Sequence, residues 1–122
     1  MSAVTESILD STKAALGIVP TYDAFDNQLI MYINTAFSTL HQLGVGPDEG
    51  FFIEDNTATW TDFLNGKRLL NMVITYVHMS VRLMFDPPAN SFATTAMKEQ
   101  MKELEWRINV QVDPDLETTS VG

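Results

Sequence analysis

Apolar residues cover almost the whole circumference of one predicted helix, which spans residues 67 to 85. They are Leu69, Leu70, Met72, Val73, Ile74, Tyr76, Val77, Met79, Val81, Leu83, Met84 and Phe85. A helix that is apolar on most sides is normally buried on most sides. At a rise of about 1.5 Å per residue, this helix would be about 28 Å long. We therefore expect it to cross the whole domain, with the other elements packed around it.

The polar residues of this helix fall on one narrow stripe. They are Asn71, Thr75, His78 and Arg82. Their intervals of four, three and four residues are those of neighbours on one helix face. The stripe faces either solvent or another subunit, where His78 and Arg82 would meet acidic side chains. The apolar surface exceeds what a chain of this length can cover, so we expect Val77 or Val81 to lie between subunits or directly behind such an interface.

The segment Asp86-Pro87-Pro88 predicts a rigid elbow after this helix, because prolines donate no backbone hydrogen bond and Pro87 disfavours helical geometry at Asp86. Asn90 or Ser91 should then cap a second long helix over residues 91 to 111. Its buried stripe is predicted to be Ala93, Met97, Met101, Leu104 and Ile108. Trp106 lies off that stripe and needs a second surface to cover it. With its neighbour Arg107, it joins the candidate subunit interface.

The first half of the chain predicts shorter helices. One spans residues 5 to 16 and ends at Gly17; the next is capped by Thr21 or Asp23 and is stopped by the segment 44–47. A short helix should begin at Thr57 or Thr59 and end at 65–66. The predicted fold is all-α: a small bundle of four to five helices, with two long C-terminal helices joined by the Asp-Pro-Pro elbow. We expect one domain over residues 1–111 and a flexible acidic tail over 112–122.

Two segments outside the helices are candidates for contact with a partner. Phe51, Phe52 and Ile53 are consecutive apolar residues in a predicted loop, which either folds back onto the core or contacts another chain. The polar tail has few apolar residues. They are Val112, Leu116 and Val121. Both segments are therefore candidate contacts with a partner protein.

The charge of the chain is unevenly distributed. The net charge is −9, of which residues 1–65 contribute −8, residues 66–110 contribute +2 and residues 111–122 contribute −3. An acidic front and a mildly basic back favour complementary surfaces, head to tail between copies, although ordinary solubility would explain the same charges. Sequence-specific or tight nucleic-acid binding is disfavoured, because it requires a clustered basic patch.

The residue patterns of common catalytic and metal sites are missing from the sequence. The two histidines, His41 and His78, have no second histidine at metal-binding spacing, and the chain has no cysteine. The segment 44–47 lacks the Lys-Ser/Thr of a phosphate loop. No pair of nucleophile and base is legible. We predict no enzyme activity, no catalytic residue, no cofactor and no metal.

We also predict no membrane span, because the apolar helix contains too many costly polar groups. They are Lys67, Arg68, Asn71, His78 and Arg82. The opening residues show no basic segment followed by an apolar run, so we expect no secretory signal and folding in a reducing cytoplasm.

The run LLNMVITYVHMSVRLMFDPPANSFATTAMKEQMKELEWRINVQ resembles the head–tail connector (adaptor) proteins of long-tailed bacteriophages, in particular the short helical connectors of siphophages. The features that carry the resemblance are TYVHMSVRLMFDPP, a helix begun by Asn or Ser, and KEQMKELEWRINV. The upstream segments ALGIVPTYDAFDNQLIMYINTAFSTLHQLGVGP and TWTDFL also fit. The resemblance extends from Ser7 to Gln111, and none of its motifs carries chemistry.

The resemblance implies a virion protein of the head–tail neck, assembled in the host cytoplasm. Such a subunit forms a closed ring beneath the portal protein, with the portal's twelvefold symmetry. The ring extends the DNA channel and presents a surface to the next connector (stopper) or to a tail protein. An acidic subunit suits a channel that passes DNA without holding it. The alternative from another class is a small helical regulatory or inhibitor protein that binds one host or phage protein.

Overall fold

Five helices account for the regular structure of residues 7–64 and 67–112, the part of the chain that the computed structural model describes. They are α1 (Ile8–Ala15), α2 (Asp26–Gln42), α3 (Trp60–Phe63), α4 (Lys67–Phe85) and α5 (Ser91–Val112). The described residues form no strand, only one isolated bridge between Ser7 and Thr59. The predicted all-α bundle is confirmed.

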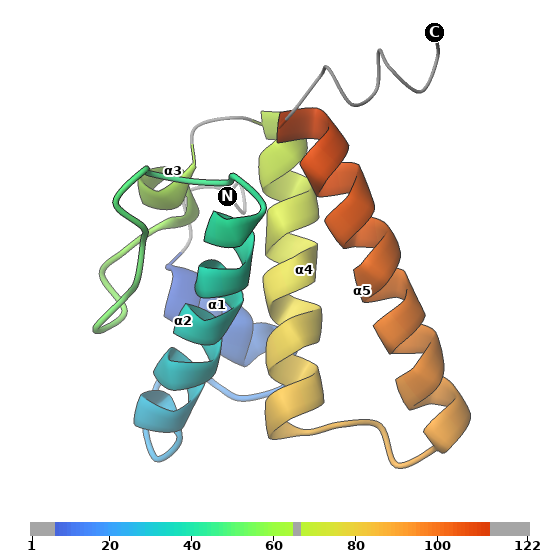
Figure 1. Ribbon diagram of the computed structural model, residues 1–122. Coiled ribbons are helices and arrows are strands. Elements are labelled where there is room, and N and C mark those ends of the chain that lie inside the picture. The colour runs from blue at the N-terminus through green and yellow to red at the C-terminus, as the bar shows by residue number, and fades with distance from the viewer. Residues whose placement is uncertain (1–6, 65–66, 113–122) are drawn as a thin grey trace, which may run out of the picture.

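The apolar helix α4 lies in the middle of the fold (Figure 1), as its sequence predicts. It packs against α2 on one side and α5 on the other, and α1 contacts both α2 and α4. Five residues of α4 form its contribution to the buried core. They are Leu70, Val73, Tyr76, Val77 and Val81. Other core residues come from the first half of the chain, including Trp60 of α3, which is fully buried. The Nε1–H of Trp60 donates a hydrogen bond of 2.9 Å to Ser11 Oγ, which ties α3 to α1.

The first helix ends as the sequence predicts, but the start of the second helix differs. Gly17 adopts φ +81° immediately after α1, a conformation that glycine reaches at little cost. Neither Thr21 nor Asp23 caps α2: the helix begins at Asp26, and no side-chain cap bond forms there. Asp26 instead pairs with Lys13 of α1, whose Nζ lies 2.8 Å from Asp26 Oδ1. This tertiary contact joins the first residue of α2 to α1.

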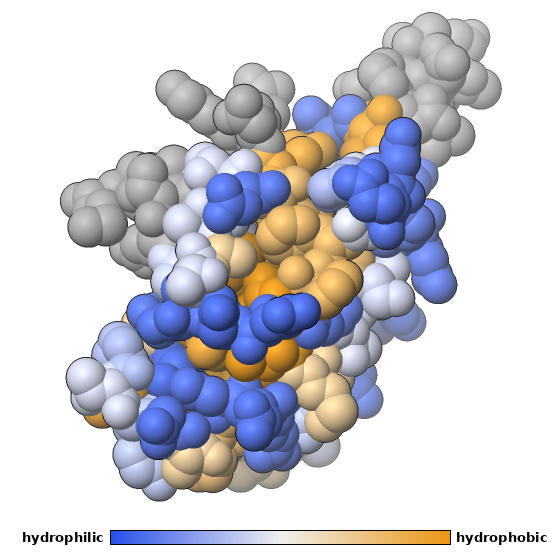
Figure 2. Space-filling view, turned by 90° about the vertical axis from the view of Figure 1, so that its left-hand side faces the viewer, coloured by the Kyte–Doolittle hydropathy of each residue, from blue (hydrophilic) through white to orange (hydrophobic). Residues whose placement is uncertain are grey.

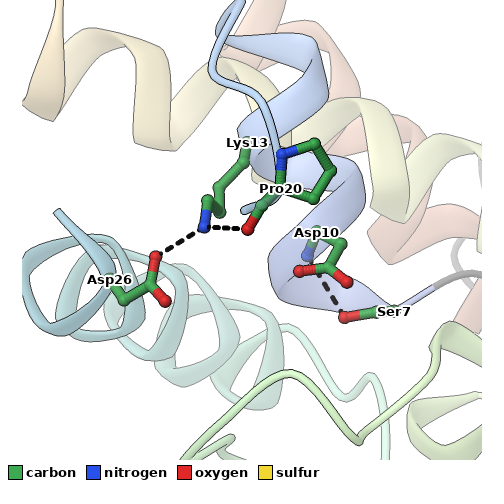
Figure 3. Close-up of polar contacts among 5 residues, drawn as sticks. All are labelled: Ser7, Asp10, Lys13, Pro20 and Asp26. Atoms are coloured by element: carbon green, nitrogen blue, oxygen red, sulfur yellow. Dashed lines mark hydrogen bonds and ion pairs between the residues drawn. The ribbon is translucent and has the colours of Figure 1, made fainter. Parts of the chain in front are cut away.

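Lys13 is the main polar group inside the fold, with 1% of its side chain exposed. Figure 3 shows its ammonium lying between Asp26 and the turn that leads into α2. Besides the ion pair, Nζ donates a 2.8 Å hydrogen bond to the carbonyl oxygen of Pro20. Lys13 therefore joins α1, the connecting turn and α2.

The predicted elbow separates the two long helices. α4 ends at Phe85, and Asn90 caps α5, because its Oδ1 accepts hydrogen bonds from the backbone N–H groups of Phe92 at 2.7 Å and Ala93 at 3.3 Å. α5 continues to Val112, one residue beyond the predicted domain end. Of the predicted stripe of α5, only Ile108 is fully buried; Met97, Met101 and Leu104 are half-buried and Ala93 is exposed.

α5 is only partly buried because it lies close to α4 over only part of its length. The two helices lie close together where α4 begins and separate toward the elbow (Figure 1). The Tyr76 hydroxyl donates a 2.7 Å hydrogen bond to Glu105 Oε2 and links the helices in their closer half. Burial and this bond to an acid raise the pKa of the Tyr76 hydroxyl. The elbow half of α5 therefore presents apolar side chains that its own protomer covers only partly.

Candidate interaction surfaces

The described residues hold no cluster of three or more histidine, cysteine or acidic side chains that could hold a metal ion. No helix in the described part of the chain is both long and apolar enough to cross a bilayer. Two surfaces of the described residues combine apolar groups, charge and a hollow. One is the loop after α2, and the other is the groove between α4 and α5.

The three consecutive apolar residues in the loop after α2 differ in burial. Ile53 is buried at 2% exposure, Phe51 is half-buried, and Phe52 is 66% exposed. Phe51 packs edge-on against Phe37 of α2, with ring centroids 5.3 Å apart, and it also contacts Phe63 of α3. Phe51 and Ile53 therefore fold onto the core, while Phe52 is exposed and its contact with another chain stays a prediction.

Two side chains of α2 hold this loop in place. Asn34 forms two hydrogen bonds with the backbone of Ile53. Its Nδ2 donates to the Ile53 carbonyl oxygen at 3.0 Å, and its Oδ1 accepts from the Ile53 N–H at 2.7 Å. His41 Nε2 lies 2.9 Å from the carbonyl oxygen of Asp48. The role of Asn34 was not predicted from the sequence, because its partner Ile53 lies nineteen positions away. The loop is thus anchored rather than free, and it presents Phe52 in a defined position.

We define the Phe52 loop as residues 48–55. Its four acids, all exposed, are Asp48, Glu49, Glu54 and Asp55. The Thr57 hydroxyl and the Thr57 backbone N–H both donate hydrogen bonds to Asp55 Oδ1. Both bonds lower the pKa of that carboxyl, and the bond from the hydroxyl has the larger effect. A hollow of about 260 Å³ lies between this loop and α2, next to Phe52. Figure 2 views the side of the molecule where α3 lies in Figure 1, and there apolar residues form a strip between bands of polar residues.

The polar stripe of α4 divides into two parts. Asn71 and Thr75 are exposed, while His78 and Arg82 are half-buried. The His78 ring packs against Trp60 at a centroid distance of 5.7 Å, and its Nε2 is buried without a hydrogen-bond partner among the described residues. His78 therefore packs against its own protomer, and its expected contact with an acid of another subunit stays a prediction. Arg82 Nε donates to the backbone carbonyl of Asp86 at 2.6 Å, which leaves its charge without a carboxylate within 4 Å in the described part of the chain.

Val77 and Val81 lie in the core of the protomer itself, each 0% exposed. A direct contact of either residue with a second subunit would require α4 to leave that core. Of the two alternatives expected for them, only a position behind an interface is compatible with this burial. Their side chains therefore do not form part of the candidate surfaces, and their substitution tests folding first.

The second surface is a groove of about 280 Å³ between α4 and α5. It is lined by Thr75, Met79, Gln100, Glu103, Leu104 and Arg107. Glu103 and Arg107 form an exposed ion pair of 2.9 Å at its edge. Trp106 precedes Arg107 on α5 and is 65% exposed, so no part of the described protomer supplies the covering surface expected for it. Of the predicted interface residues, Thr75 and Arg107 line this groove, and Trp106 lies outside its lining.

The tail candidates are only partly described. Val112 is the last residue of α5 and packs against the core, so close to Gly44 that a Cβ on that glycine would lie 2.9 Å from Val112 Cγ1. It is therefore a helix residue rather than part of a free tail. Leu116 and Val121 lie outside the described residues, so their predicted contact with a partner stays a prediction.

An aromatic cluster at the elbow end was not anticipated. Phe25 stands between Tyr22 and Phe85, with ring centroids 5.6 Å and 5.1 Å away, and it is 38% exposed. Phe92, in the first turn of α5, is 85% exposed. These aromatics mark a third apolar region of the described residues.

His78 should make the free energy of unfolding depend on pH. Burial lowers its pKa from 6.5 to about 4, because its site disfavours the charged ring. The unfolded chain takes up this proton near pH 6.5, so the stabilisation is complete above that pH and is lost as the pH falls toward 4. The loss is at most about 3 kcal/mol.

The measurement is urea denaturation at pH 7, 5.5 and 4.5 for the wild type and His78→Gln. Carboxylates also titrate in this range, so the two proteins are compared at each pH. The difference between their free energies of unfolding should shrink as the pH falls. Asn71→Gln, at an exposed position of the same helix that does not titrate, is the control and should follow the wild type. A constant difference between wild type and His78→Gln at all three values of pH would show that His78 is not held neutral.

One comparison with known proteins gives a match. The profile of a family described as phage connector protein matches residues 8–115 of the chain, which include all five helices and both candidate surfaces. No curated protein and no solved structure shows significant similarity to the chain. The family match covers more than half of the chain, and it agrees with the resemblance carried by the two long helices and their elbow.

Proposed function

Because the chain belongs to the family of phage connector proteins, we propose that it is a ring-forming subunit of the virion neck that joins the portal vertex of the head to the tail. The family match over residues 8–115 is the observation that carries this proposal. The family is one of structural proteins, not a class of enzyme. The protein would bind the portal protein on one side and the next connector or a tail protein on the other.

Several features of the protomer support assembly rather than chemistry. Three large aromatic side chains are more than half exposed, namely Phe52, Phe92 and Trp106. Exposed aromatics are typical of the contact residues of protein–protein interfaces. The described residues hold no metal cluster, and both hollows are open and shallow. We therefore expect such a subunit to bind protein partners rather than a small-molecule substrate.

The charge of the chain supports a role around passing DNA. A net charge of −9 repels the phosphate backbone, so a ring of these subunits would add many negative charges around a channel without providing a basic patch that holds the duplex. In such a ring, DNA would slide past the subunits without sequence-specific contact. We propose a closed ring with the symmetry of the portal, so that each subunit meets an equivalent portal surface.

The proposal can be tested with purified proteins. Size-exclusion chromatography with light scattering would measure the mass of the chain alone and after mixing with the portal protein of the same phage. We expect a complex that contains many copies of the chain per portal ring, and no such complex with an unrelated ring protein. A stable monomer or dimer that ignores the portal would contradict a connector role and would favour the regulatory alternative.

The tail should contribute to portal binding. Residues 113–122 are polar and acidic, and ordering a tail costs about 1–2 kcal/mol per residue, so a single tail would dock weakly while a ring of tails would gain avidity. We expect removal of residues 113–122 to abolish portal binding in a pull-down and to leave the helical circular dichroism intact. Val112 must be kept, because it belongs to α5 and packs against the core. Undiminished binding by the shortened chain would show that the portal contact lies elsewhere.

A further inference from the structure

The Phe52 loop has the properties of a preformed knob. Phe52 is 66% exposed, while its neighbours Phe51 and Ile53 fix the loop from below and Asn34 bonds the backbone at Ile53. A loop whose backbone is already held in position loses little conformational freedom when it binds, which favours affinity. An aromatic side chain also has the largest contact area to bury, about 150–250 Å². The loop is therefore built to insert Phe52 into a hollow on another molecule.

The groove between α4 and α5 has the properties of a receptor for such a knob. Its apolar lining comes from Met79 of α4 and Leu104 of α5, both half-buried. Thr75 and Gln100 supply polar walls, and the exposed indole of Trp106 lies farther out on α5. Methionine is unbranched and flexible, so Met79 can adapt to an entering ring. The groove occurs where α5 begins to separate from α4, which is why the protomer leaves these apolar groups partly uncovered.

The charges of the two surfaces are complementary. The Phe52 loop holds four exposed acids and no base. Arg107 lies at the edge of the groove, and Arg82 lies on the same stripe of α4 as Thr75. The Glu103–Arg107 pair has side chains 61% and 59% exposed, and exposed pairs contribute little, so Arg107 can exchange this partner for an acid of the loop. Opposite charges raise the rate of association and fix the orientation of the partners.

The same charges exclude a symmetric contact through the loop. If two copies met loop to loop, four acids on each side would face one another, and such like-charge contacts are unfavourable. A two-fold dimer formed through the Phe52 loop is therefore disfavoured. A contact between unlike surfaces avoids this repulsion.

The two surfaces lie on different sides of the protomer. In Figure 1 the loop between α2 and α3 lies at one edge of the molecule, α5 lies at the opposite edge, and α4 lies between them. Each subunit can therefore use both surfaces at once, with one neighbour on each side. Repeated contacts between unlike surfaces generate a ring when the rotation between copies closes, and a filament when it does not.

From these observations we propose that successive copies of this chain join by insertion of the Phe52 loop of one copy into the α4–α5 groove of the next. The inference rests on the proposed ring and specifies which two surfaces form it. Phe52 is the anchor, Met79 and Leu104 line its pocket, and the acids of the loop pair with Arg107 and Arg82 around the edge. Raising the salt concentration should weaken this contact, because screening shortens to about 8 Å at physiological ionic strength.

The absence of cysteine from the chain allows a direct test by cross-linking. The double variant Phe52→Cys/Thr75→Cys, assembled on portal and treated with a short bis-maleimide, should give a ladder of covalent multimers up to the full ring. Either single variant should give no ladder. The control Phe52→Cys/Phe92→Cys pairs the loop with an exposed aromatic site outside the groove and should also give none. Dimers from Phe52→Cys alone, or its cross-linking to portal, would overturn the proposed contact.

A mixing experiment tests the direction of the contact. Phe52→Asp removes the knob, and Thr75→Trp fills the groove; both sites are exposed, so both variants should keep the fold. Each alone should lose ring assembly, with association weakened at least about tenfold, as for the loss of an anchor residue. Mixed together they should form one-to-one dimers and nothing larger, because one good knob and one good groove remain. Phe92→Ala is the matched control and should assemble normally.

The outcomes separate this inference from the proposed function. If the wild type forms no assembly on portal, the connector proposal itself fails. If the wild type assembles and Phe52→Asp or Thr75→Trp assembles equally well, the ring stands and the knob-and-groove contact is wrong. If the mixture of the two variants forms full rings, the contact does not join unlike surfaces of neighbouring copies.

Discussion

Val77→Asp should unfold the protomer. Val77 is 0% exposed in the middle of α4, the helix that contacts α1, α2 and α5. An aspartate there would be a buried charge without a partner, at a cost of several kcal/mol in addition to the lost apolar contacts. A domain of this size has a total stability of about 5–15 kcal/mol. We therefore expect the variant to lose most of its helical circular dichroism at 25 °C, or to melt far below the wild type.

The control for Val77→Asp lies two residues away on the same helix. Thr75 is exposed, so Thr75→Asp introduces the same charge without burying it and should change the free energy of unfolding by about 0.5 kcal/mol or less. A folded Val77→Asp protomer that fails only in ring assembly would contradict the burial of Val77 within its own subunit. It would instead place this face of α4 at a contact between subunits.

Lys13→Met should cost about 2–3 kcal/mol, which corresponds to a fall of about 10 °C in melting temperature. The substitution removes the ammonium that bonds the Pro20 carbonyl and pairs with Asp26. Removing one partner of a buried pair leaves the other charge uncompensated. The Asp26 side chain is 29% exposed and can recruit water, which keeps the expected loss below that of a fully buried acid. Differential scanning calorimetry would measure it.

Two further variants make the Lys13 measurement specific. Lys102→Met applies the same substitution to a side chain that is 74% exposed, and it should leave the melting temperature almost unchanged. Lys13→Met combined with Asp26→Leu removes both charges, so it should recover much of the stability that Lys13→Met loses. If Lys13→Met melts like the wild type, the ion pair does not hold α1 and α2 together.

The elements that the sequence predicted well are those fixed by local chemistry. The apolar run of α4 allowed only a central position, and Pro87 and Pro88 allowed only an end to the helix at Phe85. Asn90 capped the next helix because its side chain reaches the free N–H groups a few residues later. In each case, residues within a few positions of one another determine the outcome.

The misses depend on contacts between distant residues. The sequence did not predict the ion pair between Lys13 of α1 and Asp26, the first residue of α2. Asn34 anchors a residue nineteen positions away. The stripe of α5 was correct in spacing, but its elbow half is only partly buried because α5 leans away from α4. Periodicity gives the face of a helix and does not give its angle to the next one.

The candidate surfaces were predicted by composition more than by geometry. Phe52, Trp106 and Arg107 stood out as residues without an obvious place in the core, and the first two are indeed exposed large apolar side chains. Val77 and Val81 were grouped with them because the apolar surface of their helix exceeds what the chain was expected to cover, and His78 because it lies on the polar stripe. The structure separates the two groups, since burial depends on which neighbouring helix covers each side of α4.

Cryo-electron microscopy of the portal vertex in the assembled virion tests the central claim most directly. We expect a closed ring of five-helix subunits between the portal and the tail, with DNA passing through its centre. Within that ring, the Phe52 loop of each subunit should lie in the α4–α5 groove of its neighbour. A neck in which the portal meets the tail without this subunit, or a virion that lacks the chain altogether, would contradict the connector assignment.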